Sequence, residues 1–192
     1  MRKQMKRFLD LILKSRYKKR QSFNYFWKVR EQALNGGVKA YFSKIKYNKY
    51  IDRYNAFIPL AVCFNSKPIF PHGISGVFIS SGAVIGDNCT IFHQVTIGSN
   101  TLKDSKGCGA PIIGNNVYIG CGSKIIGNVK IGDNVRIGAN CVVTKDVASN
   151  CTVVAAPPRI IVKENNDNTF VQLVDFKRIF KDEEKDIKTF LE

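Results

Sequence analysis

The stretch that decides the fold is IIGNNVYIGCGSKIIGNVKIGDNVRIGANCVV, residues 112–143. An aliphatic residue returns in it every six positions, and the same interval continues backward, with one interruption, to Ile79. The positions that share the interval are Ile79, Ile85, Ile91, Ile97, Ile113, Ile119, Ile125, Ile131, Ile137 and Val143. An α-helix needs a spacing near 3.6 and an amphipathic strand needs strict alternation, so the pattern fits neither. Six-residue repeats are typical of a parallel β-helix.

The residues between the repeats favour the same fold. Gly, Asp and Asn recur after each short strand, where the chain must turn a corner. Asn and Asp tolerate the left-handed backbone conformation that such corners require. Each hexapeptide therefore supplies one face of a prism, and the coils must stack because a single coil cannot bury its own interior.

The pattern divides the chain into three segments. Residues 1–60 form a basic, mainly helical N-terminal segment, residues 61–163 a β-helix domain, and residues 164–192 a C-terminal tail. Within the domain the repeats run from about Gly73 to Val154, and residues 99–111 are an inserted loop. The tail holds the apolar residues of a terminal helix, which would cap the open end of a solenoid. The expected class is mainly β, with helices confined to the ends.

Composition excludes several classes of protein. No apolar run approaches the roughly 18 residues of a membrane span, and the basic N-terminus lacks the apolar stretch and cleavage site of a secretory signal. The six cysteines show no CxxC spacing, which predicts reduced thiols and no zinc site. We expect a cytoplasmic protein without a metal.

The net charge of +15 is concentrated near the N-terminus, where residues 1–60 hold 16 Lys and Arg against 3 Asp and Glu. One helical face there collects Met1, Met5, Phe8, Leu9 and Ile12. Such a basic amphipathic helix indicates peripheral contact with the anionic inner face of the membrane, or packing on a neighbouring subunit with a solvated basic face. Both alternatives stay open. Nucleic acid is not expected as a partner, because no recognition motif accompanies the basic residues.

Three longer stretches carry a family resemblance: GISGVFISSGAVIGDNCTIFHQVTIGSNT at 73–101, APIIGNN through TKDV at 110–147, and VVAAPPRIIVK at 153–163. Together they resemble the hexapeptide-repeat acyltransferases, specifically the serine acetyltransferase-like branch. The resemblance implies a left-handed coil, a homotrimer, acetyl-CoA as the acetyl donor, and active sites between neighbouring subunits.

Acetyl transfer to a hydroxyl needs a base, and histidine side chains titrate near neutral pH. The chain has two histidines. His72, in FPHGISG, aligns with the family's general base; its alternative is an ordinary surface histidine. His93, in IFHQVTIG, lies where relatives carry His or Gln, close to one 18-residue coil further on. We expect His93 near the site as an acceptor-binding or orienting group, the alternative being a packed or interfacial ring.

The expected donor site follows from stacking. Cys121 and Ala139 are 18 residues apart at one hexapeptide position, so they should lie above one another on one edge of the prism. Small side chains there, with Gly120 beside them, leave the backbone open to a pantetheine arm. The resemblance adds four residues toward the coenzyme, whose phosphates suit cations: Ser99, Thr144, Lys145 and Arg159.

The acceptor is predicted from the positions at which this chain differs from the family that it resembles. Serine acetyltransferases carry an Asp before the base and Arg-His at the end of the loop, whereas this chain has Pro71 and Gly109-Ala110. With free serine, Lys103 or Lys106 would have to compensate. We therefore predict O-acetylation of a sugar hydroxyl on a small or lipid-linked capsular or exopolysaccharide precursor. The alternatives are serine O-acetyltransferase and a non-catalytic trimeric scaffold.

Overall fold

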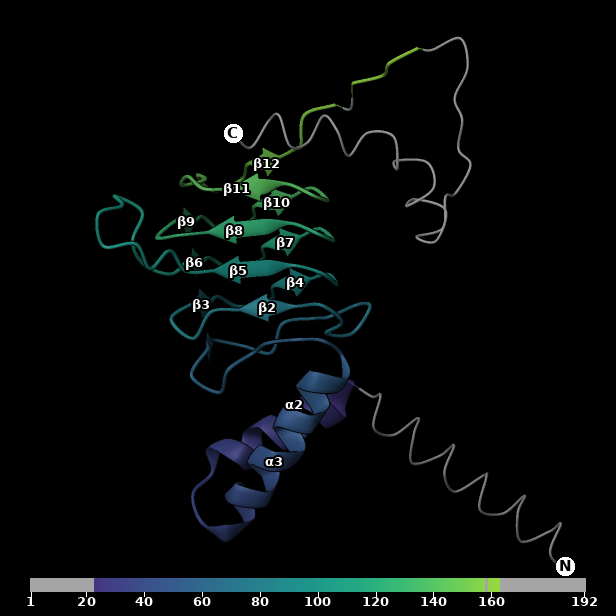
Figure 1. The fold of residues 1–192 in the computed structure, drawn as a ribbon, viewed down its shortest axis with the longest axis vertical. Coiled ribbons are helices and arrows are strands. Elements are labelled where there is room, and N and C mark those ends of the chain that lie inside the picture. Colours follow the sequence, from purple (N-terminus) through teal and green to yellow (C-terminus); the bar gives the residue numbers. More distant parts are fainter. Residues whose placement is uncertain (1–22, 158, 163–192) are drawn as a thin grey trace, which may run out of the picture. The chain divides into compact units, whose positions relative to one another are not determined.

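Two helices precede the repeats in the computed structural model, which describes residues 23–157 and 159–162 (Figure 1). They are α2, Phe23–Leu34, and α3, Val38–Arg53. Among the described helices, none is both long and apolar enough to cross a membrane. The chain divides into two units, Met1–Ala156 and Pro157–Glu192. The amphipathic helix expected at Met1–Ile12 and the tail expected at 164–192 lie outside the described residues.

The repeats form short strands that pair in parallel. The strands are β1 Cys63–Phe64, β2 Phe78–Ile79, β3 Val84–Ile85, β4 Thr90–Ile91, β5 Thr96–Gly98, β6 Ile112–Ile113, β7 Tyr118–Ile119, β8 Lys124–Ile126, β9 Lys130–Ile131, β10 Arg136–Ile137, β11 Val142–Val143 and β12 Thr152–Val153. They make three four-stranded sheets, β1–β3–β6–β9, β4–β7–β10–β12 and β2–β5–β8–β11. Successive strands of one sheet lie one coil apart, so the sheets are the three faces of a prism.

The interior of the prism is the core that the sequence predicts. All ten aliphatic residues of the six-residue pattern are at most 5% exposed. In Figure 1 the front strands β2, β5, β8 and β11 run to the left while the coils rise toward the C-terminus, and the chain returns behind them. The coil is therefore left-handed. The predicted fold, a left-handed parallel β-helix with helices before it, is confirmed.

The coil begins one turn earlier than the pattern predicts. Strand β1 pairs with β3, and isolated bridges join Phe57 to Phe78 and Ile69 to Thr90. The inward residues of this first coil are Ile58, Phe64 and Phe70, which also recur every six positions. The turn was missed because two of its three inward residues are aromatic and prolines interrupt it.

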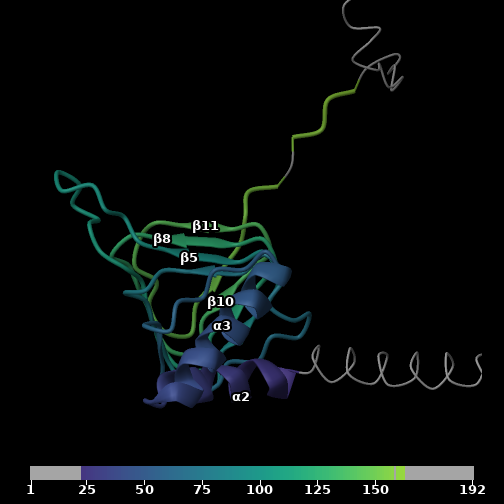
Figure 2. The same ribbon diagram turned by 60° about the horizontal axis from the view of Figure 1, so that its bottom comes forward.

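The helices cover the start of the coil, as Figure 2 shows. Arg30 of α2 is only 4% exposed. Its guanidinium donates hydrogen bonds to the Tyr47 hydroxyl and to the carbonyls of Pro59, Leu60 and Val62 at 2.7–3.1 Å. Tyr47 in turn donates to the Ile58 carbonyl. One buried cation thus fastens both helices to the first coil by satisfying carbonyls that the open end of a solenoid would leave unpaired.

Asparagines form one corner of the prism. Asn88, Asn116, Asn134 and Asn150 all have φ between 55° and 63°, the left-handed region. The Asn116 amide donates to the Asn134 side-chain oxygen at 3.2 Å, and Asn134 donates to Asn150 at 3.1 Å. The side chain that tolerates the corner conformation therefore also ties one coil to the next.

The inserted loop leaves the stacking intact. Asn100 and Gly109 exchange two backbone hydrogen bonds of 2.9 Å, which close the loop at its base. Before the loop, Gly98 stays in register with Ile126, and after it Ile112 stays in register with Lys130. The loop projects from the corner between β5 and β6 (Figures 1 and 2).

Candidate active site

His72 lies at a corner of the first coil, not ahead of the coil. The chain leaves the buried Phe70, turns through a 3.0 Å hydrogen bond from the Gly73 amide to the Phe70 carbonyl, and continues with Gly73 at a φ of 70°. This corner joins the β4–β7–β10–β12 sheet to the β2–β5–β8–β11 sheet, and we call it the histidine edge. The His72 side chain is exposed there.

His93 occupies the same corner one coil later. The Nδ1 atoms of His72 and His93 are 3.0 Å apart, and the ring centroids are 4.9 Å apart. His93 is half-buried, whereas His72 is exposed. The structure therefore brings the two predicted histidines into direct contact, closer than residence on successive coils alone requires.

Aromatic rings support the pair. The Phe92 ring meets the His72 ring edge-on, with centroids 5.3 Å apart and an interplanar angle of 90°. Phe92 also contacts Tyr118 of the next coil, at 5.1 Å between centroids. Within the described part of the chain, neither histidine is hydrogen-bonded or ion-paired to a carboxylate. The environment of the pair is thus aromatic on one side and open on the other.

Cys121 and Ala139 continue the histidine edge. The Gly122 amide donates to the His93 carbonyl at 3.1 Å, and the Asn140 amide donates to the Cys121 carbonyl at 2.9 Å. His93, Cys121 and Ala139 are therefore equivalent positions of three successive coils. Cys121 is half-buried and Ala139 is exposed. On the coils that follow the histidines, the edge therefore carries small side chains.

Gly120 is required by the packing itself. A Cβ at this position would lie 2.7 Å from the Ala139 nitrogen, closer than side chains tolerate. Its amide already donates to the Ile137 carbonyl at 2.8 Å. The stacking of coils accounts for this glycine, and its N–H is engaged within the sheet.

Lys124 is a residue of this edge that sequence reasoning missed. Its Nζ donates to the carbonyls of Gln94 and Gly122 at 3.0 and 2.9 Å. The ammonium group therefore lies beside the residue that follows His93. The sequence shows that Lys124 directly precedes the inward Ile125 and so must face outward, but this alone does not distinguish it from other outward lysines such as Lys130.

The other predicted residues lie at a different corner. Ser99, Thr144 and Lys145 follow strands β5 and β11 at the corner where the loop begins, which we call the loop edge. From His93 to Ser99 the chain crosses one sheet face, roughly 20 Å of extended backbone. Lys103 and Lys106 are exposed in the loop. Within one chain, a sheet face therefore separates these residues from the histidine pair.

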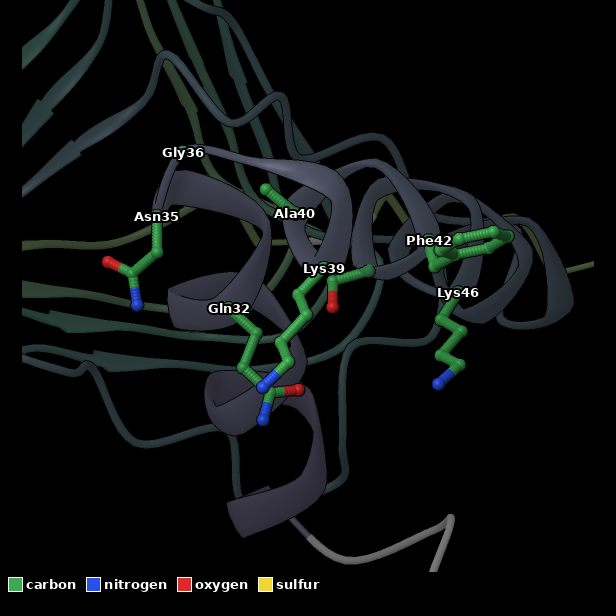
Figure 3. Close-up of a pocket in the computed structure, with 8 residues that line it drawn as sticks. Gln32, Asn35, Gly36, Lys39, Ala40, Phe42 and Lys46 are labelled. Atoms are coloured by element: carbon green, nitrogen blue, oxygen red, sulfur yellow. The ribbon is translucent and has the colours of Figure 1, made fainter.

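Surface hollows in the described part of the chain lie outside the histidine edge. Ser99 lines a shallow groove of about 360 Å³ together with Phe57, Phe78 and Thr96, on the outer face of β2 and β5. A larger pocket, about 540 Å³, lies on α2 and α3. The side chains of Gln32, Asn35, Lys39 and Lys46 extend from one side of these helices (Figure 3). This larger pocket contains no predicted site residue.

Two further predictions concern Arg159 and metals. Arg159 belongs to the second unit and is exposed there. Across the described residues, no cluster of three or more His, Cys, Asp or Glu side chains is placed to hold a metal ion.

Comparison with known proteins identifies the family. A family model described as bacterial transferase hexapeptide (six repeats) matches residues 110–145. The serine acetyltransferase of Buchnera aphidicola is 32% identical over 165 residues, which cover 84% of this chain and 55% of that protein. The chain belongs to the hexapeptide-repeat acyltransferases, in their serine acetyltransferase-like branch. A Synechococcus elongatus serine acetyltransferase is 47% identical over 92 residues, 48% of this chain and 36% of that protein.

Solved structures place the coil of this hexapeptide-repeat acyltransferase among serine acetyltransferases as well. Isoform 3 from Entamoeba histolytica, in complex with cysteine, gives a TM-score of 0.58 at 30% identity and covers 73% of this chain and 50% of that one. The Neisseria gonorrhoeae enzyme, in complex with serine, gives 0.55 at 26% identity and covers 71% and 55%. The chain spans between 36% and 55% of the length of these relatives.

The prediction of a sugar acceptor is wrong. The relatives compared above are serine acetyltransferases, and one of the solved structures holds serine itself. The prediction failed because it gave three local departures, Pro71 and Gly109-Ala110, more weight than the long match along the coils. Side-chain changes in a corner or loop leave the scaffold unchanged and are weak evidence about the acceptor.

Proposed function

We propose that the protein is an acetyl-CoA-dependent serine O-acetyltransferase, with His72 as general base. The observation that carries the proposal is the His72–His93 contact on an edge whose next two coils bear Cys121 and Ala139. A base and a smooth, small-residue surface thus lie in one column. The names of the relatives supply the acceptor, serine.

The chemistry asked of His72 is a proton transfer in two steps. Its Nε2 takes the proton of the serine hydroxyl as the hydroxyl oxygen forms a bond to the carbonyl carbon of the acetyl group. When the carbon–sulfur bond breaks, the same Nε2 returns that proton to the departing thiolate. General base catalysis of this kind contributes about 10²–10⁴-fold to the rate. His72 is exposed, so a hydroxyl can reach it.

The donor is proposed to lie along the histidine edge. Cys121 and Ala139, with Gly120 beside Cys121, leave room for a pantetheine arm. The coenzyme A part of the donor carries phosphate groups, which favour nearby cations and hydroxyls. We propose this role for residues that the resemblance indicates and that lie on the loop edge, which a neighbouring subunit would bring to the donor: Ser99, Thr144 and Lys145.

A homotrimer follows if the loop contributes to the site. Lys103 and Lys106 project from the loop edge, across a sheet face from His72, so one chain cannot bring them to its own histidine pair. In a three-fold assembly the loop edge of one subunit can meet the histidine edge of the next. A sedimentation mass of about three chains is expected, each of 21.6 kDa.

The serine carboxylate needs a cation, because the Arg-His of the family loop is Gly109-Ala110 here. Lys103 and Lys106 could supply it from a neighbouring loop. Lys124 supplies it from the histidine edge itself, where two of its three N–H donors hold backbone carbonyls and the third is left for a ligand. We assign the binding of the serine carboxylate to Lys124, and a substitution of Lys124 tests this role below.

We also propose that the N-terminal region contacts anionic membrane. Helix α3 exposes an apolar stripe at helical spacing, made of Val38, Tyr41, Phe42 and Ile45. The same helix carries Lys39, Lys44, Lys46 and Lys49. An apolar stripe among lysines suits an anionic lipid surface. Co-sedimentation with anionic vesicles should fall in a Tyr41→Ser/Phe42→Ser variant; equal binding would reject the proposal.

The central experiment measures thiol release from acetyl-CoA with L-serine. We expect turnover in the wild type, a loss of about 10²–10⁴-fold in His72→Ala, and little change in Asn65→Ala, an exposed residue of the same first coil. Absence of turnover with serine would overturn the proposed function. Absence of acetyl-CoA binding by calorimetry would leave the trimeric scaffold.

A further inference from the structure

The contact between the two histidines restricts their tautomers. A nitrogen–nitrogen distance of 3.0 Å is a hydrogen bond, so one Nδ1 must carry the hydrogen and the other must accept it. In the described part of the chain no carboxylate bonds to either ring. Each histidine therefore has the other as its ring partner, and the tautomer of one dictates the tautomer of the other.

Only one of the two arrangements lets His72 act as a base. If His93 accepts, the His72 hydrogen sits on Nδ1 and the lone pair of Nε2 is free to take a proton. If His93 donates, His72 carries its hydrogen on Nε2 and cannot accept another there. We infer that His93 is the positioning residue of His72, holding its Nδ1–H so that Nε2 faces the acceptor hydroxyl as a base. The inference rests on the proposed function in one respect, that His72 is the base.

The two residues are not interchangeable in these roles. His93 is half-buried, and its backbone carbonyl is fixed by the Gly122 amide of the next coil. His72 is exposed, and its ring contacts the Phe92 ring in an edge-to-face arrangement. The more buried ring of His93 is suited to orient its neighbour, and the more exposed ring of His72 is the better placed of the two to reach a substrate.

The same contact acts during proton transfer. Once Nε2 holds the hydroxyl proton, His72 is an imidazolium with hydrogens on both nitrogens. Its Nδ1–H still donates to His93, so the positive charge keeps an acceptor. When Nε2 passes the proton to the thiolate sulfur, His72 returns to its starting tautomer. A neutral imidazole here stands in for the carboxylate that would follow from an Asp at position 71, where this chain has Pro71.

Variants of His93 distinguish a hydrogen-bond acceptor at position 93 from a hydrogen-bond donor. Glutamine offers a carbonyl oxygen as acceptor, so His93→Gln should keep kcat within about tenfold of wild type. His93→Ala removes the acceptor and should lower kcat by about 10–100-fold with little change in KM. Lysine only donates, so His93→Lys should fall to the level of His72→Ala. Equal activity of the Ala and Gln variants would overturn the inference.

Ring nitrogen spectra provide a readout that requires no acceptor. The chain contains two histidines, so single variants assign every ring signal in ¹⁵N spectra. We expect neutral His72 with hydrogen on Nδ1 and neutral His93 with hydrogen on Nε2, and a switch of His72 toward the Nε2–H form in His93→Ala. His72 as Nε2–H in the wild type would overturn the inference. The expected spectra without turnover on serine would instead leave the positioning intact and reject the proposed function.

Discussion

The backbone carbonyl of His93 accepts a 3.1 Å hydrogen bond from the amide of Gly122. This bond sets the corner that bears the histidine pair directly against the corner that bears Cys121, and the next coil adds Ala139 in the same column. The base and the surface proposed for the donor are therefore held in register by the coil itself. No separate domain or hinge is needed to align them.

Enlarging Ala139 should block the donor. Ala139 is exposed, so Ala139→Leu should fold normally and raise the KM for acetyl-CoA by about tenfold or more, since the side chain would fill the proposed pantetheine path. Ala148→Leu, also exposed but at another corner, is the matched control. Steady-state kinetics with varied acetyl-CoA decide the matter, and similar KM values for the two variants would remove the donor from this edge.

Neutralising Lys124 should weaken serine binding. Lys124→Gln keeps much of the side chain's length and removes its charge, so the KM for serine should rise about tenfold while kcat changes little. Lys130→Gln, an exposed lysine on the neighbouring sheet, serves as control. If the Lys124 variant keeps the wild-type KM, the carboxylate is bound elsewhere, and the loop lysines become the next residues to test.

Two inactive variants should restore activity when they assemble together. One carries His72→Ala, and the other has residues 101–106, which include Lys103 and Lys106, replaced by Gly-Gly. If each site joins the histidine edge of one subunit to the loop of the next, every mixed trimer has one complete site of three and should recover roughly a third of the wild-type activity. Co-expression with different affinity tags isolates the mixed trimers. Recovery at background level would mean that the two elements do not meet between subunits.

Removing Arg30 should destabilise the helical cap. Arg30→Met retains apolar bulk but leaves three carbonyls and the Tyr47 hydroxyl without their donor, at a cost of about 2–4 kcal/mol in the free energy of unfolding. Lys28→Met, exposed on the same helix, should change little. Denaturant unfolding must use one protein concentration, because assembly contributes to stability. Equal midpoints would show that the buried cation contributes no net stability.

The cysteines should differ sharply in reactivity. Cys89 is fully buried, and burial raises the pKa of its thiol, so less of it is the reactive thiolate at neutral pH. Cys108 is exposed in the loop. A disulfide reagent at pH 8 should label Cys108 quickly and Cys89 only after unfolding, as mass spectrometry of digested protein can follow. Prompt labelling of Cys89 in the native state would contradict the described core.

The sequence alone predicted the repeating features of the fold and missed the features that do not repeat. Ile113 and its equivalents predicted the prism, and the 18-residue step from Cys121 to Ala139 predicted an edge that the backbone hydrogen bonds reproduce. The first coil was not predicted because Phe64 and Phe70 occupy inward positions that are aliphatic in the other coils. Arg30 escaped because a buried cation satisfied by carbonyls has no local signature.

The histidines show the limit of spacing more closely. An interval of 21 residues predicted neighbouring coils, but a ring-to-ring hydrogen bond depends on the extra residues of the Gly73–Gly76 turn and on side-chain rotamers. Such details arise from packing between elements, which periodicity does not encode. Similarly, Lys103 and Lys106 were predicted near the histidines, yet only the path of the chain through β5 shows that a sheet face lies between them.

The closed base of the loop has a consequence for how such a protein can change over time. Because Asn100 and Gly109 pair with each other and Gly107 accepts a hydrogen bond from the Asn128 amide, residues 101–106 can be lengthened, shortened or exchanged without moving a strand. Doubling the length of such a loop costs only about 0.6 kcal/mol in closure entropy. Selection can therefore act on the reach and charge of this segment almost independently of folding. The length and charge of this loop can therefore differ widely between chains whose coils remain nearly the same.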